Sequence, residues 1–163
     1  NAADMQAANE TNMALWGGAM ANATLTVHAA GWLEGGLSFG YEKFINDVEA
    51  LQTMAELCVK PFGNDAEIGF DALAEVDPGG HFFATQHTMD RYQSAFYAPL
   101  VSDLTNFGAW VEAGAKTSTQ RATDIWTKNL KDFQDPVHGD TAASNIDAFI
   151  EMRKQKGGAL PQE

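Results

Sequence analysis

The stretch at residues 23–36 carries the side chains best suited to chemistry, and it reads ATLTVHAAGWLEGG. His28, Trp32 and Glu34 stand there between a β-branched run and a group of glycines. Ligands in α/β folds bind where strands end, and glycines let a ligand approach the backbone closely. The alternative is a tight turn with a packed tryptophan and a surface glutamate. The residue types by themselves leave both interpretations open.

A second candidate lies near the beginning of the chain, where residues 4–22 predict a helix with Asp4 as its cap. Gln6 and Glu10 are four residues apart, so they share one face of that helix. A glutamate in the first turns of a helix that faces a cavity could bind a cation or act as a base. Pairs of this kind are more often a solvated helix start.

The remaining reactive residues match no known motif. His81 and His87 are six residues apart, whereas metal ligands on a helix prefer spacings of three or four, so we expect no metal site. Cys58 is the only cysteine, which excludes an intrachain disulfide and is typical of a reducing compartment. The glycine-rich stretches do not have the spacing of a phosphate-binding loop.

The elements that must position these side chains are mostly helices. Alternation of apolar and polar residues predicts one strand over 23–30, and ligands in α/β folds bind where strands end. A short strand or extended segment is expected at 81–85. Helices are expected at 41–59, 65–76, 88–97, 104–115, 117–133 and 141–156. A buried strand needs hydrogen-bonding partners, which must come from another copy of the chain or from sequence outside these residues.

Two of the helices have further sequence signals. The helix over 41–59 has apolar side chains at spacings of three and four, which predicts one buried face. That face comprises Phe44, Val48, Leu51, Met54, Leu57 and Cys58. Thr117 and Gln120 form a capping box at the start of the helix over 117–133.

Composition excludes some classes of partner. The 163 residues suit one domain, and the apolar content of 45% argues against disorder. The net charge is 10 minus 22, or −12, which argues against nucleic acid and anionic membranes as partners because both need a basic face. We find no apolar run long enough to span a bilayer and no targeting leader. A soluble cytoplasmic protein is the expectation.

Four ordered segments resemble one family. They are DMQAANE (4–10), HAAGWLEGGLSFGYEKFINDVE (28–49), PGGHF with HT and RY (78–92), and EAGAKTSTQRATDIW (112–126). Together they are similar to the C-terminal part of the trimethylamine methyltransferase family. The resemblance runs from Asp4 to about Pro136, and HAAGWLEGG is its most distinctive segment. Ala8 replaces the glycine that the family usually has after Gln-Ala.

The resemblance implies the α/β fold class, with this chain as the C-terminal portion of a (β/α)8 TIM barrel that is mostly α-helical here and has one or two strands. Residues 1–60 would be the last barrel βα units and 61–163 a helical C-terminal extension. Some archaeal members carry pyrrolysine near the D-x-Q-A-x-x-E segment. The chain would therefore be a pyrrolysine-free member or would begin after that position, and the fragment alone should be inactive.

The resemblance also implies the reaction. Family members move a methyl group from trimethylamine or a related tertiary or quaternary methylamine to the cobalt of a corrinoid, as in methanogenesis. The corrinoid (cobalamin) is carried by a separate partner protein, and none is bound directly by this chain.

On this basis the site residues receive roles. Glu34 and Glu10 are the catalytic candidates, and His28, Trp32 and Gln6 are the substrate-binding candidates, with no metal. Expected partners are a corrinoid protein, a small methylated amine and further copies of the chain. A second hypothesis stays open, in which the chain is a non-enzymatic helical module that oligomerises to complete a sheet.

Overall fold

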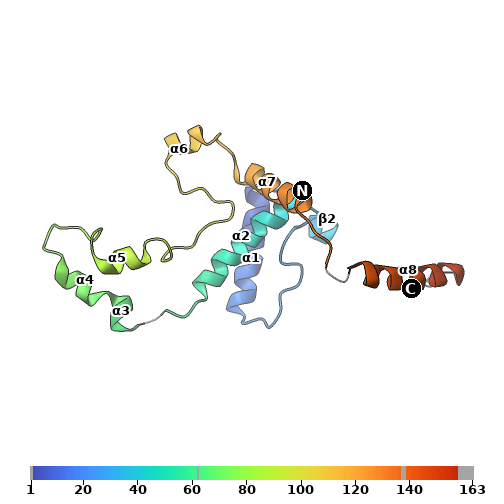
Figure 1. The fold of residues 1–163 in the computed structure, drawn as a ribbon, viewed down its shortest axis with the longest axis horizontal. Coiled ribbons are helices and arrows are strands. Elements are labelled where there is room, and N and C mark those ends of the chain that lie inside the picture. Colours follow the sequence, from blue (N-terminus) through green and yellow to red (C-terminus); the bar gives the residue numbers. More distant parts are fainter. Residues whose placement is uncertain (1, 62, 137–138, 158–163) are drawn as a thin grey trace. The chain divides into compact units, whose positions relative to one another are not determined.

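The computed structural model describes residues 2–61, 63–136 and 139–157. Along the chain it contains α1 (Met5–Met20), β1 (Trp32–Leu33), the 3₁₀ turn η1 (Glu34–Gly36), β2 (Ser38–Phe39), α2 (Tyr41–Leu57), α3 (Asp65–Ile68), α4 (Phe70–Glu75), α5 (Gln86–Arg91), α6 (Phe107–Glu112), α7 (Ser118–Lys131) and α8 (Gly139–Gln155). One compact unit ends at Thr127 and a second begins at Lys128. All candidate site residues belong to the first unit, in which α1 and α2 lie side by side (Figure 1).

The helix starts follow local signals in the sequence. Asp4 caps α1, because its Oδ1 accepts a hydrogen bond of 3.2 Å from the Ala7 N–H. The capping box of α7 is confirmed in both directions. The Gln120 N–H donates to Thr117 Oγ1 at 3.3 Å, and the Thr117 N–H donates to Gln120 Oε1 at 2.8 Å.

Each predicted helical segment overlaps a helix of the structure, with shifted ends. The helix expected over 65–76 is divided into α3 and α4 at Gly69, whose φ of +71° ends the first helix in a left-handed residue. Residues 81–85 form bends and turns and no strand. Among the described residues, the helices lack the combination of length and apolar composition that crossing a membrane requires.

The strand predicted over 23–30 is wrong for the described structure. These residues form an irregular segment in which Leu25 is 77% exposed and Val27 is 68% exposed. A strand forms only when another segment satisfies its backbone groups, and no described segment pairs with this one. The only described sheet is instead the short antiparallel hairpin of β1 and β2, in which Trp32 lies opposite Phe39.

The buried face predicted for α2 is also wrong. Phe44, Leu57 and Cys58 are exposed, and only Met54 of the predicted face is buried. The helix instead buries three charged side chains, which are those of Lys43, Asp47 and Glu49. Ile45 is buried on the same helix. Helical spacing identifies residues that share a face, but the elements packed around the helix decide which face is buried.

The small core of the first unit lies between α2 and α7. Ile45, Val101 and Ala122 are buried together, and Ile125 and Trp126 pack against them. Glu49 accepts a hydrogen bond of 2.5 Å from the Val101 N–H, which ties the segment before α6 to α2. This core holds the start of α2, and with it the hairpin, in place.

Candidate functional site

A cavity of about 260 Å³ is lined by all five residues that the sequence singled out. Gln6 and Glu10 line it from α1, His28 lines it from the segment before β1, and Trp32 and Glu34 line it from the hairpin. The two α1 residues are separated from the other three by 18 residues or more in the chain, so their convergence is a property of the fold. The structure therefore brings the predicted site residues together, although the strand that was expected to lead into the loop of Trp32 and Glu34 does not form in the described residues.

The wall formed by α1 is ordered by a contact within the helix. Gln6 Nε2 donates a hydrogen bond of 2.8 Å to Glu10 Oε1, as the four-residue spacing allows. A carboxylate has about four acceptor positions, so this bond leaves the Glu10 carboxylate able to accept another donor or to face a cation. Both side chains are exposed toward solvent, so a ligand reaches them without rearrangement of the helix.

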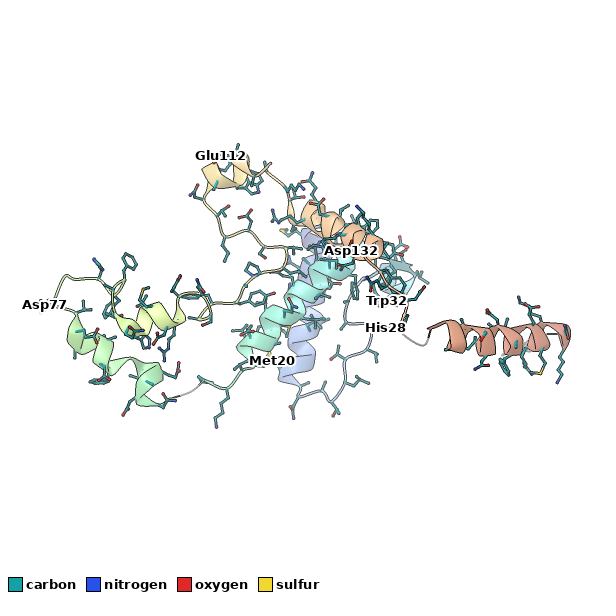
Figure 2. The ribbon with its side chains drawn as sticks, viewed as in Figure 1. Met20, His28, Trp32, Asp77, Glu112 and Asp132 are labelled. Atoms are coloured by element: carbon teal, nitrogen blue, oxygen red, sulfur yellow. The ribbon has the colours of Figure 1, made fainter. Side chains whose placement is uncertain are left out.

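The part of the lining formed by residues 28–34 is aromatic. The rings of His28 and Trp32 have centroids 5.0 Å apart at an angle of 43° (Figure 2). Phe39 meets Trp32 edge-on at 5.5 Å, because the two residues are paired across the hairpin. Trp32 remains 38% exposed. The indole is thus supported from two sides while part of its surface stays open.

Glu34 is placed in the same wall by an uncommon backbone conformation. Its φ is +54°, and the φ of His28 is +56°. Non-glycine residues adopt this left-handed region at a cost of roughly 1 kcal/mol or more, and such residues concentrate at functional sites. Ser38 Oγ donates a hydrogen bond of 2.8 Å to Glu34 Oε2, which orients the carboxylate. His28 and Glu34 are therefore held in a backbone conformation whose energetic cost must be offset by contacts elsewhere in the fold.

Sequence reasoning missed a buried ion pair beside this cavity. Lys43 lines the cavity, and its Nζ lies 2.5 Å from the carboxylate of Asp47. The same Nζ donates to Thr11 Oγ1 at 2.7 Å, and Asp47 Oδ2 accepts from the Gly31 N–H at 2.8 Å. The only sequence signal is the four-residue Lys–Asp spacing. That spacing is common on exposed helix faces, where such pairs contribute little.

An aromatic series extends from the site toward α7. Phe39 contacts Tyr41 at 6.1 Å, and Tyr41 stacks on Trp126 at 5.1 Å. Trp126 Nε1 donates a hydrogen bond of 2.7 Å to Glu42 Oε1. That bond is the largest influence on Glu42 and lowers the pKa of its carboxyl from the ordinary value of 4.5. The hairpin is anchored through these contacts to the core.

Other candidate residues lie elsewhere. His87 lines a separate cavity with Asp65 and Asp90, and His81 is exposed. Within the described residues, no three histidine, cysteine or acidic side chains come together as possible metal ligands. A larger cavity of about 560 Å³ shares Lys43 and Asp4 with the first cavity and is lined by no aromatic or histidine residue. The cavity of about 260 Å³ combines the Trp32 and His28 rings with carboxylates from α1 and the hairpin.

Comparison with known proteins agrees with the sequence resemblance. Residues 1–158 match the family described as trimethylamine methyltransferase (MTTB). The glycine betaine methyltransferase of Desulfitobacterium hafniense (strain Y51) is 29% identical over 155 residues, which are 95% of this chain and 32% of that protein. The trimethylamine methyltransferase MttB of D. hafniense (strain DSM 10664 / DCB-2) is 28% identical over 159 residues, or 95% of this chain and 31% of that protein.

An archaeal relative is similar over a shorter range. The trimethylamine methyltransferase MttB1 of Methanosarcina acetivorans is 28% identical over 130 residues, which are 78% of this chain and 26% of that protein. The chain therefore spans about a third of the length of the curated relatives it matches.

Proposed function

This chain belongs to the trimethylamine methyltransferase family, and we propose that the complete protein transfers a methyl group from a methylated ammonium compound to a corrinoid on a separate protein. The relatives carry the names of trimethylamine and glycine betaine methyltransferases. These names favour an enzyme over a module that only oligomerises. Because the chain spans about a third of those relatives, the activity is proposed for the complete polypeptide.

The observation that carries the proposal is the shared cavity of the five candidate residues. Its volume of about 260 Å³ is slightly below the range of about 300–1,000 Å³ that is common for drug-sized ligands, so it suits a small molecule. The open part of the Trp32 ring can face the methyl groups of an ammonium ion. Glu10 and Glu34 supply negative charge from two different elements.

The residues have distinct roles in this proposal. Trp32 and His28 hold the methylated cation through their ring faces, and Gln6 orients the Glu10 carboxylate. Glu10 and Glu34 place negative charge beside the nitrogen. During transfer, the N–CH₃ bond breaks with its electron pair left on nitrogen, and the reduced corrinoid supplies the pair for the new bond to the methyl group.

The fold proposal follows from the same family membership. We place the chain as the C-terminal part of a (β/α)8 barrel, with residues 1–60 as its last units and 61–163 as a helical extension. The large apolar side chains that are open to solvent support this placement, because additional chain would cover them. Leu25, Val27 and Phe44 are examples close to the candidate site.

The test uses the complete polypeptide with trimethylamine or glycine betaine as donor and free cob(I)alamin as acceptor. We expect release of dimethylamine or dimethylglycine that requires both donor and acceptor. The double variant Glu10→Gln/Glu34→Gln should lose most of this release, whereas Glu112→Gln, an exposed residue of α6, should keep it. Absence of release with both donors, together with absence of binding by calorimetry, would reject the proposed function.

A further inference from the structure

The buried pair of Lys43 and Asp47 connects three elements around the candidate site. Each of the two residues is only 3% exposed, and Lys43 Nζ lies 2.5 Å from both carboxylate oxygens of Asp47. Removing a pair of charges from water is costly, and replacing such a pair with apolar residues of similar volume is often neutral or stabilising. Stability alone therefore explains this pair poorly.

One end of the pair contacts the α1 wall of the cavity. Lys43 Nζ donates a hydrogen bond of 2.7 Å to Thr11 Oγ1. Thr11 follows Glu10 directly in α1, and both residues line the cavity. The ammonium group has three protons, and the bonds to Thr11 and to the two oxygens of Asp47 use all of them. Lys43 is consequently held in one position against α1.

The other end contacts the aromatic wall. Asp47 Oδ2 accepts a buried hydrogen bond of 2.8 Å from the Gly31 N–H, and the Gly31 carbonyl accepts one of 3.0 Å from the Gly40 N–H. Gly31 has a φ of +85°, and a Cβ there would lie 2.2 Å from the ring of Phe39. The N–H and the carbonyl of Gly31 are thus both hydrogen-bonded. These bonds fix the backbone position from which the Trp32 side chain extends.

The pair also determines the charge beside the cavity. Lys43 lines the cavity that we assign to a cation, and an ammonium group there would repel such a ligand. The Asp47 carboxylate neutralises that charge at close range. The carboxylates of Asp4, Glu10 and Glu34 are then left as the net charge of the cavity lining.

We propose that Asp47 is a positioning residue for the cation site. It holds the Trp32 segment through the Gly31 N–H, and it cancels the charge of Lys43, which in turn is bound to the α1 wall. This inference rests on the proposed function, because it gives a role to the pair at the same site. Asp47 and Lys43 therefore have an electrostatic role and an orienting role, and neither role requires contact with the substrate.

The experiment separates these two parts with two variants of the complete protein. Asp47→Asn keeps an acceptor oxygen for Gly31 but leaves Lys43 unpaired. The double variant Lys43→Met/Asp47→Leu removes both charges and the bond to Gly31, and its apolar side chains preserve folding. The control is Lys128→Met/Asp132→Leu, which removes an exposed pair of the same residue types at the same spacing.

The ligands are glycine betaine and 3,3-dimethylbutanoate, which differ only in having nitrogen or carbon at the trimethylated centre. Calorimetry gives the ratio of the two affinities, which reports the charge at that centre. In Asp47→Asn we expect this ratio to fall by about 10-fold, because an unpaired ammonium repels the cation. In the double variant we expect both affinities to fall by a similar factor, with the ratio unchanged, because the orienting bond is lost without a new charge. The control variant should have the same affinity as the wild type for each ligand, and therefore the same ratio of affinities.

A wild-type ratio in Asp47→Asn overturns the charge role, and wild-type affinities in the double variant overturn the orienting role. A wild-type protein that binds neither of these ligands nor trimethylamine, and that releases no demethylated product, rejects the proposed function separately. In that case the orienting role is tested by the rate of backbone amide hydrogen exchange at residues 31–33. Faster exchange in the double variant than in the control supports it, and equal exchange overturns it.

Discussion

The rings of His28 and Trp32 lie 5.0 Å apart at an angle of 43°, although no regular element connects the two residues. The contact is possible because His28 adopts a positive φ of 56° and Gly31 one of 85°. These two residues turn the chain so that both rings line one wall of the cavity. Figure 2 shows them at the entry to the hairpin.

Replacement of Trp32 by alanine should weaken binding of trimethylamine to the complete protein. A contact between a cation and an aromatic ring contributes about 0.5–2 kcal/mol, so the dissociation constant should rise by roughly 2- to 30-fold. Trp110→Ala is the matched control, because that tryptophan lies on α6 and does not line the cavity. Titration calorimetry measures both. Equal affinities in the wild type and Trp32→Ala would show that the ring only packs.

Replacement of Glu34 by glutamine keeps the shape of the side chain and removes its charge. We expect the affinity for glycine betaine to fall by about 5- to 10-fold, since a unit charge about 4 Å away contributes roughly 1 kcal/mol where water screens it. The affinity for 3,3-dimethylbutanoate should not fall. Glu112→Gln changes the net charge equally at an exposed position and serves as control. A parallel loss for both ligands would point to a structural role for Glu34.

Glu42 should make stability depend on pH in the acid range. Its carboxylate accepts hydrogen bonds from Trp126 Nε1 at 2.7 Å and Thr123 Oγ1 at 2.9 Å, and its pKa lies below 4.5 in the folded chain. A lowered folded pKa adds stability that is fully present above the unfolded value and is lost as the pH falls through the folded value. Glu42→Gln should therefore lower the free energy of unfolding by about 1 kcal/mol at neutral pH.

The difference between Glu42→Gln and the wild type should shrink as the pH falls below 4.5. Urea unfolding of the complete protein at a series of pH values measures it. A constant difference across the series would contradict the assignment of the bond to the ionised carboxylate.

Gly31 and Gly35 should respond differently to alanine. Both have a positive φ, but a Cβ at Gly31 would meet the ring of Phe39 at 2.2 Å, whereas a Cβ at Gly35 would meet nothing within 4 Å. Gly35→Ala should cost about 1–2 kcal/mol through backbone strain alone, and Gly31→Ala should cost an additional 1–3 kcal/mol through overpacking. Urea unfolding compares the two. Equal losses would mean that Phe39 moves aside freely.

The helices could be predicted because their signals are local. Asp4 caps α1, and Thr117 and Gln120 cap α7, through bonds that reach three residues along the chain. The strand over 23–30 could not be predicted in the same way, since its hydrogen bonds depend on a partner that is distant in sequence or in another chain. The hairpin of β1 and β2 was missed because its strands have two residues each, which is too short for a period to be recognised.

The sequence by itself determined which residues of the candidate site are chemically suited to a cation, since the ring of Trp32 and the carboxylates of Glu10 and Glu34 have that capacity wherever they lie. Only the tertiary structure decided that they line one cavity and that Lys43 and Asp47 are buried beside it. The apolar spacing of α2 indicated a different buried face, because the spacing within a helix carries no information about its neighbours. Burial of charge depends on a partner at hydrogen-bonding distance, and Thr11 and Gly31, which meet the pair at 2.7 Å and 2.8 Å, come from other parts of the chain.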